Sequence, residues 1–498
     1  MPAGRRHTRL VPLVPIALAV ALMAALFAAP VGAAGVTPTL RLFVSSTQIT
    51  AERDRRDFIS IDPGAWVTPV SDDFELWVSR PDYDTPITIK QVDADTKAVL
   101  RTFPAENLDG WFGLKDFAHY EVRDVDGTVV AGDTFSFCPN GYLRQRLSDE
   151  SPLNPTYPYF CNGGPFTKGS IWGIDEGWAT GIIGDYYYGL GWKAERRNYT
   201  LTFWIDPAWV DLLDIAPTDA SAVVQVKAVD RGTLGAQQRP AARPIGPKAP
   251  KAVPYAPTPI VTNPDPQSLP DLVALPGWGM STYSRRGHDY LAFNSTEWNA
   301  GPGTMVVEGF RGTDDEAMDA FQYFLVDGQP VGRAPIGELE YHAGGGHNHW
   351  HFEEFTRYSL LDGALQQVLV SGKQSWCLVN TDAIDLTLPN ANLLGYGQDL
   401  GTSCGGPGAL WIREVLDVGW GDTYGQYVAG QAFDITDLPN GPYYVRVHVN
   451  PTGSMFESTT ANNIEDRLIR LRGKPGHRRV AVPPWHGIDT ENYCYYCG

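Results

Sequence analysis

The chain has 498 residues, enough for at least two domains, and its 43% hydrophobic and 19% charged residues exclude a disordered protein. Its content of 15 Trp, 23 Tyr, 20 Phe, 52 Gly and 39 Pro favours strands joined by turns over long helices. The net charge of −18 argues against electrostatic binding of nucleic acid or of an anionic membrane, and it would attract a cationic partner.

The first 34 residues are expected to be a signal peptide. Arg5, Arg6 and Arg9 precede an apolar stretch from Leu10 to Ala29, and small residues continue to Ala34. Cleavage would remove three arginines and no acidic residue, which changes the net charge from −18 to −21. We therefore expect a secreted or extracytoplasmic protein with no membrane attachment after cleavage.

The six cysteines suit an exported protein, because disulfides persist in oxidising compartments. They are spaced as three local pairs, and a disulfide within each pair is the simplest expectation. These pairs are Cys138 with Cys161, Cys377 with Cys404, and Cys494 with Cys497.

A proline-rich stretch divides the chain at residues 230–268. Its composition predicts an extended, semi-rigid linker. We place one domain at residues 35–229 and a second at residues 269–472. Residues 473–498 are then a C-terminal tail that ends in a Cys-x-x-Cys sequence, for which a small structural disulfide is the default interpretation.

The two sides of this linker look like copies of each other. Four short matches occur in the same order, and their offset rises slowly from 238 to 244 residues, as a few loop insertions would cause. The matches are 117–120 with 355–358, 136–138 with 375–377, 177–178 with 419–420, and 205–207 with 449–451. We infer a duplication, whose alternative is chance similarity of turn residues.

Alternating side chains predict strands in both halves. Residues 201, 203 and 205 are apolar in the first half, as are residues 445, 447 and 449 at the matching place in the second. A period of two places such residues on one buried sheet face. We therefore predict an all-β protein with two related β-sandwich-like domains in tandem.

The sharpest local motif is a run of alternating histidines after three glycines. His347, His349 and His351 would lie on one face of a strand, and His342 precedes them. Three neutral imidazoles suit copper, zinc, nickel or iron, whereas calcium and magnesium prefer oxygen ligands. The spacing predicts a metal site but does not choose copper over zinc.

The residues around this motif resemble the lysyl oxidase family. The family's H-x-H-x-H sequence is followed by an acidic pair and Phe, as in His347 to Phe355 here. The likeness continues in 372–377 and 422–425, similar to the segments that hold the family's cofactor lysine and tyrosine. It covers about 200 residues in order, which is more specific than the histidines alone.

The resemblance implies that His347, His349 and His351 bind Cu(II). It also implies that Lys373 and Tyr424 become the crosslinked cofactor lysine tyrosylquinone. Without it, Lys373 would be interpreted as a surface lysine and Tyr424 as a core aromatic residue.

The implied activity is that of a copper amine oxidase. Such an enzyme converts a primary amine, either peptidyl lysine or a small amine, to an aldehyde, and dioxygen is reduced with release of hydrogen peroxide and ammonia. Two alternatives remain open at this stage. One is a non-catalytic copper-binding extracellular scaffold, and the other is a zinc-dependent hydrolase with an open metal site.

One position departs from the family pattern. Arg357 occupies the place of the histidine that is the family's usual candidate base, and arginine does not accept a proton at working pH. On a continuous strand Arg357 would face the histidine site and stabilise an anionic quinone oxygen, or it would form a surface salt bridge. Asp422, His342 and His448 are the candidate bases that remain.

The first copy lacks the predicted site residues. The offsets place Asp109, Trp111 and Gly113 where the three histidines would be, and Thr134 at the position of Lys373. We therefore expect the first copy to pack against the second or to present substrate to it.

Overall fold

The computed structural model describes residues 37–161, 163–183, 189–233, 252–313, 315–344, 347–373, 375–395 and 404–492. The predicted signal peptide and the Cys494–Cys497 pair lie outside these residues. In the described part of the chain, no helix is long and apolar enough to cross a membrane.

The described chain is all-β, as predicted. Strands form almost all of its regular structure, and every strand pair is antiparallel except β2 with β15. The helical elements are short: η1 (Ala105–Asn107), α1 (Pro207–Leu213) and η2 (Pro266–Ser268). Asp206 caps α1 by accepting a hydrogen bond from the Ala208 amide, and Pro207 begins the helix.

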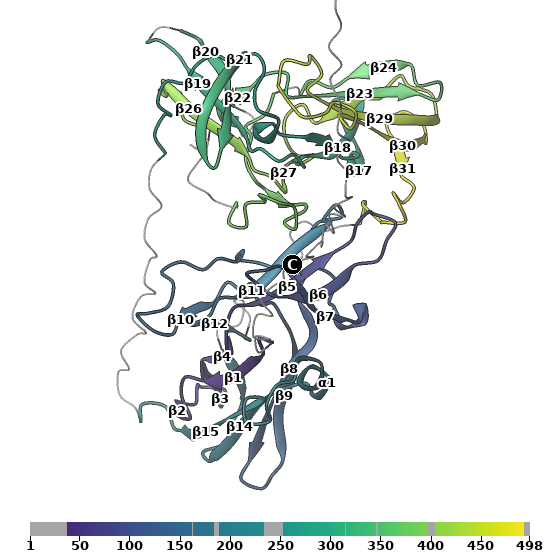
Figure 1. Ribbon diagram of the computed structural model, residues 1–498. Helices are drawn as coiled ribbons and strands as arrows, with labels where there is room; N and C mark the ends of the chain where they lie inside the picture. The colour runs from purple at the N-terminus through teal and green to yellow at the C-terminus, as the bar shows by residue number, and fades with distance from the viewer. Residues whose placement is uncertain are drawn as a thin grey trace, which may run out of the picture. The chain divides into compact units, whose positions relative to one another are not determined.

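The strands of the first half form three larger sheets and one strand pair (Figure 1). In sheet order, the first consists of β1 (Leu40–Val44), β4 (Ala65–Pro69), β12 (Trp178–Gly181) and β10 (Arg144–Arg146). The second consists of β11 (Gly169–Ile174), β5 (Phe74–Ser79), β6 (Thr88–Val92) and β7 (Val99–Phe103). The third consists of β2 (Gln48–Glu52), β15 (Ser221–Val229), β14 (Asn198–Ile205), β8 (Leu114–Asp124) and β9 (Val129–Phe137). The separate strand pair consists of β13 (Leu190–Lys193) and β3 (Phe58–Ile61).

The strands of the second half form three sheets. The first consists of β16 (Leu272–Ala274), β18 (His288–Asn299), β27 (Trp420–Tyr424) and β25 (Asp382–Ala383), with β17 (Trp278–Arg285) and β28 (Ala432–Asp434) also paired to β18. The second consists of β22 (His347–Phe352), β21 (Gln329–Gly344), β20 (Ala317–Val326), β19 (Met305–Phe310) and β26 (Trp411–Leu416). The third consists of β24 (Gln367–Val370), β23 (Thr356–Asp362), β29 (Gly441–Val449), β30 (Ile464–Arg472) and β31 (Arg479–Ala481).

The predicted alternation in β14 and β29 is confirmed. Every second residue is buried from Tyr199 to Ile205 and from Tyr443 to Val449. These residues belong to two large hydrophobic clusters, one made of residues 40–228 and the other of residues 272–471. Each half therefore buries its own apolar sheet faces, which is the main driving force for its folding.

The sheets of the two halves share their strand order. The order β1-β4-β12-β10 matches β16-β18-β27-β25, and β9-β8-β14-β15 matches β24-β23-β29-β30. The cross-strand register also matches, because Tyr120 lies opposite Phe203 and Tyr358 lies opposite Val447. These pairs preserve the sequence offsets of 238 and 244, so the topology supports the inferred duplication.

Local hydrogen bonds repeat as well. The Asp206 amide donates to the Phe117 carbonyl at 2.8 Å, and the equivalent Asn450 amide donates to Phe355 at 2.8 Å. Both predicted disulfides within the described residues are present, Cys138–Cys161 and Cys377–Cys404. The sheet β11-β5-β6-β7 matches β26-β19-β20-β21, while β22 extends only the second sheet.

The described residues from Pro38 onward form one compact unit. A third, smaller cluster joins Phe166 to Trp278, Trp298 and Ile384, so the two halves share a contact region. Their description as two separate tandem domains stays a prediction.

The described end of the proline-rich stretch contacts the second half. The Val261 amide donates to the Arg333 carbonyl at 2.9 Å, and Arg413 Nη2 donates to the Val253 carbonyl at 2.8 Å. The Arg413 guanidinium carbon lies 3.6 Å from the centre of the Tyr255 ring. Residues 252–268 therefore lie along the second half, whereas residues 234–251 of the predicted linker lie outside the described residues.

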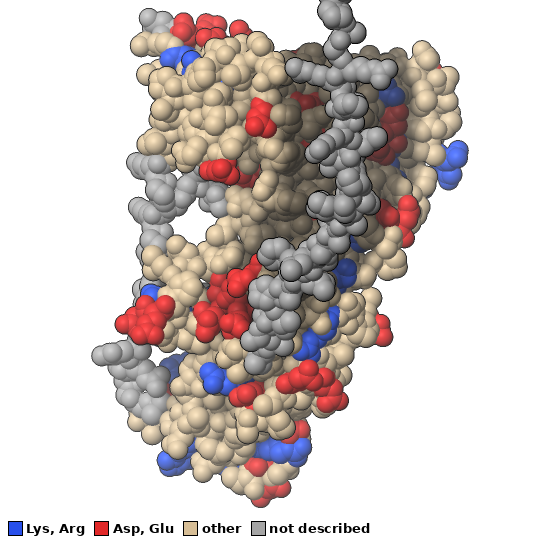
Figure 2. Space-filling model, in the orientation of Figure 1, with Lys and Arg blue, Asp and Glu red and all other residues tan. Residues whose placement is uncertain are grey.

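Both signs of charge are scattered over the face of the molecule in Figure 2, where acidic side chains form several local groups. This distribution agrees with a chain that carries a net charge of −18.

Candidate active site

The histidine motif lies on an antiparallel hairpin formed by β21 and β22. His349 lies opposite His342, and His351 lies opposite Glu340. Directly opposed residues project from the same face of an antiparallel pair, and alternate residues of one strand share a face. The hairpin therefore places His342, His349 and His351 on one face. His347 begins β22, opposite Gly344, and its side chain lies outside the described atoms.

The two described histidines of the motif converge. Their Nε2 atoms are 2.9 Å apart, and the ring centres are 4.7 Å apart. Two imidazole nitrogens that each bind one ion at about 2.0–2.1 Å and at a right angle would be separated by about 2.9 Å. His351 is fully buried, while His349 is partly exposed. This geometry fits a pair of ligands to one transition-metal ion.

His342 extends this cluster. Its ring centre lies 4.5 Å from that of His351, and its Nε2 lies 3.1 Å from Glu353 Oε1. Burial lowers the pKa of His349, and the positive charges of Lys373 and His342 lower it further. A neutral imidazole is the form that binds a metal ion, so these surroundings favour the ligand state.

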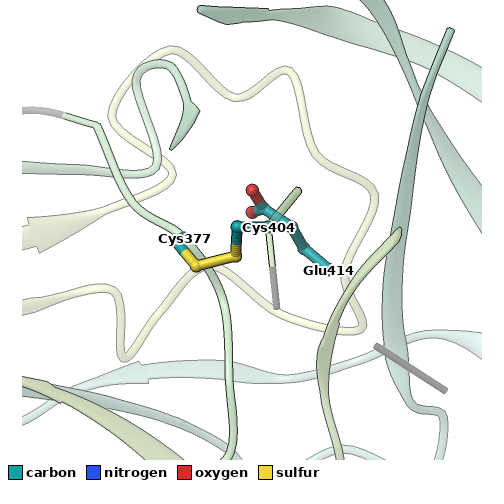
Figure 3. A group of neighbouring side chains, drawn as sticks. All are labelled: Cys377, Cys404 and Glu414. Carbon is teal, nitrogen blue, oxygen red and sulfur yellow. A yellow bond between two sulfur atoms is a disulfide. The ribbon is translucent and has the colours of Figure 1, made fainter. Parts of the chain in front are cut away.

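A second group of potential ligand atoms is not a metal site. Cys377, Cys404 and Glu414 lie together in Figure 3, but the two sulfur atoms form a disulfide and offer no thiolate. The disulfide supports the hairpin instead, because the Trp350 amide donates to the Cys404 carbonyl at 2.9 Å. The disulfide thereby holds the edge of β22 that does not pair with β21.

Lys373 and Tyr424 meet in the buried interior although they are far apart in sequence. Lys373 Nζ lies 4.6 Å from the centre of the Tyr424 ring. The two residues are only 4% and 9% exposed, so neither is a surface residue. The Tyr424 hydroxyl accepts a hydrogen bond from the Cys377 amide at 2.7 Å, and the Trp376 ring centre lies 4.1 Å from that of Tyr424.

Two backbone hydrogen bonds link the lysine segment to the end of the histidine strand. The Phe352 amide donates to the Trp376 carbonyl at 2.7 Å, and the Trp376 amide donates back at 2.9 Å. Gly430 allows close packing here. It has a φ of 88°, and a Cβ atom at this position would lie 3.0 Å from the backbone nitrogen of Lys373. The pairing of Phe352 with Trp376 thus carries Lys373 toward both the histidines and Tyr424.

The charge of Lys373 is poorly compensated. Its Nζ is buried and makes no hydrogen bond with the residues that the structure describes. Burial lowers its pKa to about 8, and the nearby carboxylates of Glu353, Asp422 and Glu414 offset this only in part. Burial likewise raises the pKa of Tyr424 well above its usual value. A lysine that loses its proton near neutral pH is a better nucleophile than a solvated one.

Arg357 does not lie on the strand that carries the histidines. The chain turns at Glu353 and Glu354, where Glu354 has a φ of 59°, and β23 then pairs with β29 in another sheet. Arg357 Nη2 lies 2.7 Å from Glu354 Oε2, and His448 is its cross-strand partner. The continuous strand on which its predicted orientation depended is therefore absent, and Arg357 forms the salt bridge that was the alternative.

Sequence reasoning missed two buried acids near Lys373 and Tyr424. Glu297 on β18 and Glu414 on β26 are both fully buried, and each carries an oxygen without a hydrogen bond. No local pattern marked them, because Glu297 lies among polar residues of β18 and Glu414 follows Arg413 on β26. Asp422, considered as a candidate base, is also buried.

In the first copy the residues at the matching positions have other contacts. Thr134 Oγ1 lies 2.8 Å from His119 Nδ1, and Asp109 accepts a hydrogen bond from Ser136 at 3.1 Å. Trp111 is buried. That the first copy lacks the site stays a prediction.

Comparison with known proteins identifies the second half. Residues 332–478 match the family model for lysyl oxidase. This chain contains a lysyl oxidase domain at residues 332–478. The resemblance in the sequence is thus confirmed, and the matched segment includes the histidine hairpin, Lys373 and Tyr424.

Named relatives share this region with the chain. Human lysyl oxidase homolog 1 is 30% identical over 218 residues, which are 43% of this chain and 35% of the relative. Human protein-lysine 6-oxidase is 30% identical over 211 residues, 41% of this chain and 46% of the relative. Its pig counterpart is 29% identical over 211 residues, 41% of this chain and 78% of the relative. The lysyl oxidase region therefore spans less than half the length of either human relative.

Proposed function

We propose that this protein is a secreted copper amine oxidase of the lysyl oxidase type. In this proposal His347, His349 and His351 hold Cu(II), and Lys373 and Tyr424 are joined as lysine tyrosylquinone. The substrate is a primary amine, either peptidyl lysine or a small amine, and dioxygen is the final electron acceptor. The products are an aldehyde, hydrogen peroxide and ammonia.

The observation that carries the proposal is the pairing of Lys373 with Tyr424. Burying an ammonium group without a hydrogen bond costs several kcal/mol, so a purely structural lysine would be replaced by an apolar residue at little cost. Its Nζ lies 4.6 Å from the centre of the one ring that the family would have it join. A covalent bond to that ring would remove the uncompensated charge.

The residues at the hairpin fit the ion that the proposal requires. His349 and His351 already place their nitrogens at the separation expected of two ligands of one ion. Glu353 would hold the nearby His342 by the contact at 3.1 Å. When bound, copper and quinone supply the redox chemistry, while the chain orients the amine and accepts its protons.

The proposed amine substrate and the proposed export are supported by indirect observations. The names of two relatives include protein-lysine 6-oxidase, which supports a lysine-like amine. A net charge of −18 would attract a cationic amine. Residues 1–34 have the composition of a signal peptide, which supports export.

Peptide mapping of protein made in copper-replete cells tests the proposal most directly. We expect a crosslinked peptide that contains Lys373 and Tyr424, about one copper ion per chain, and a coloured protein. Hydrogen peroxide should appear when diamines or lysyl peptides are added. A colourless protein that contains only zinc, has no crosslink and is inactive on amines would refute it.

A further inference from the structure

Two buried carboxyl groups face each other beside Tyr424. In the antiparallel pair of β18 and β27, Glu297 lies directly opposite Asp422, and Ser295 lies opposite Tyr424. Asp422 and Tyr424 are two residues apart on one strand, so their side chains share a face. The register thus places both carboxyl groups on the face of the sheet that carries Tyr424.

The two acids are too buried for both to be ionised. Glu297 is 0% exposed and Asp422 is 1% exposed. Directly opposed residues have Cβ atoms about 5 Å apart, and like charges at that distance are unfavourable away from water. Burial raises the pKa of both groups well above the usual values, and their mutual repulsion raises that of Glu297 further. Near neutral pH the pair therefore holds a shared proton.

Glu297 has an oxygen that can hold that proton. Glu297 Oε1 accepts a hydrogen bond from the Ser295 hydroxyl at 2.6 Å, whereas Oε2 has no partner and is free to carry the proton. Asp422 Oδ2 accepts a hydrogen bond from the Val379 amide at 3.4 Å, and the positive charge of Lys373 favours its ionised form. The charge of Lys373 thus favours Asp422 over Glu297 as the carboxylate of the pair.

Other titratable groups surround the pair. Asp382 on β25 raises the pKa of Asp422, whereas Lys373 lowers it. Glu414 on β26 also acts on Lys373 and Tyr424, and the Tyr358 hydroxyl on β23 lies 3.5 Å from Glu297 Oε1. Lys373 would lose its charge on joining Tyr424. The protonation state of Asp422 would then depend more on Glu297.

We propose that Asp422 is the general base of amine oxidation and that Glu297 is its positioning partner. This proposal rests on the proposed function. In the step, a C–H bond of the carbon next to the substrate nitrogen breaks, and its proton forms an O–H bond with Asp422. The quinone that Lys373 and Tyr424 would form would supply the oxidising chemistry that takes up the electron pair of that bond, with dioxygen as the final acceptor.

The other candidate bases are less well placed. Arg357 is bound to Glu354 and stays protonated. His448 lies opposite Arg357, in the sheet that contains β23. His342 is bound to Glu353 within the histidine cluster. Asp422, in contrast, lies two residues from the ring that forms the cofactor.

The first test compares Asp422→Asn, Glu297→Gln and Asp289→Asn in copper-loaded full-length protein. Asp289 is a matched control, because it is a buried acid on the same strand but is held by Ser284 and Gly476. We expect Asp422→Asn to form the crosslink yet lose about 100- to 10,000-fold in kcat/KM, as expected on removal of a general base. Glu297→Gln, which imitates a protonated acid, should lose less than about tenfold, and Asp289→Asn should match the parent.

A second readout does not need activity. In copper-free protein at pH 7, the parent-minus-variant infrared difference spectrum should contain the band of a protonated carboxyl group for Glu297→Gln but not for Asp289→Asn. If Asp422→Asn fails to fold, Asp422→Glu, which keeps a carboxylate, should retain more activity than Glu297→Gln combined with Asp422→Glu.

Two results would overturn this inference. One is a crosslinked Asp422→Asn protein whose kcat/KM for amines stays within about threefold of the parent value. Removal of the general base would lower kcat/KM much more than that. The other is a parent-minus-Glu297→Gln difference spectrum that contains no protonated-carboxyl band. Absence of both the crosslink and peroxide in the parent would instead refute the proposed function, while the infrared result would still report on the acid pair.

Discussion

Replacing Lys373 by methionine should stabilise the copper-free protein although it removes a residue that the proposed cofactor needs. Lys373 is 4% exposed, and its ammonium group has no hydrogen bond to any described residue. Its pKa falls from 10.5 to about 8, mainly through burial. At about 1.4 kcal/mol per tenfold change in proton affinity, the charged form costs the folded state about 3 kcal/mol. Methionine keeps the apolar stem and removes the charge.

The effect should depend on pH in a defined direction. Because the folded pKa lies below the unfolded one, the penalty is fully present below about pH 8 and declines between pH 8 and 10.5. The free energy of unfolding of Lys373→Met should therefore exceed that of the parent by up to about 3 kcal/mol at pH 7. This difference should largely vanish near pH 10.5. Urea unfolding of copper-free protein at both pH values measures it, since the crosslink is then absent from both proteins.

Lys373→Arg is the matched control. A guanidinium group stays charged in this interior, so this variant should be less stable than the parent at both pH values. On the protein surface this substitution would change the stability little, but Lys373 is buried. If Lys373→Met is no more stable than the parent at pH 7, the interpretation of Lys373 as an uncompensated buried charge is wrong.

Three further outcomes can be checked on the same protein. Lys373→Arg should bind copper as the parent does but form no crosslink to Tyr424 and release no peroxide with amines, as mass mapping and a peroxide assay would reveal. His349→Ala should lose copper by metal analysis and, with it, the crosslink; retention of one copper ion per chain would contradict its role as a ligand. Replacing both Cys377 and Cys404 by serine should lower the stability of the histidine hairpin by about 3 kcal/mol, measured by denaturant unfolding, because their disulfide closes a loop with a sequence separation of 27.

The strands and disulfides could be predicted because their signals are local. Alternating apolar residues mark β14 and β29, since the period of two is a property of the extended backbone itself. The order of the four matching segments indicated the duplication, and Cys377 with Cys404 followed from spacing. The orientation of Arg357 was not predictable in this way, because it depends on a turn at Glu354 that moves the chain from one sheet to another.

The sequence by itself determined the all-β class, the histidine motif and the resemblance of the second half to lysyl oxidase. Each of these depends on residues that lie close together in the chain. It also supplied Lys373 and Tyr424, though only through the resemblance to lysyl oxidase. Only the tertiary structure placed the Lys373 amine 4.6 Å from the Tyr424 ring centre and Glu297 opposite Asp422. These contacts join residues from different strands and loops, so they depend on sheet register and burial, which no local pattern encodes.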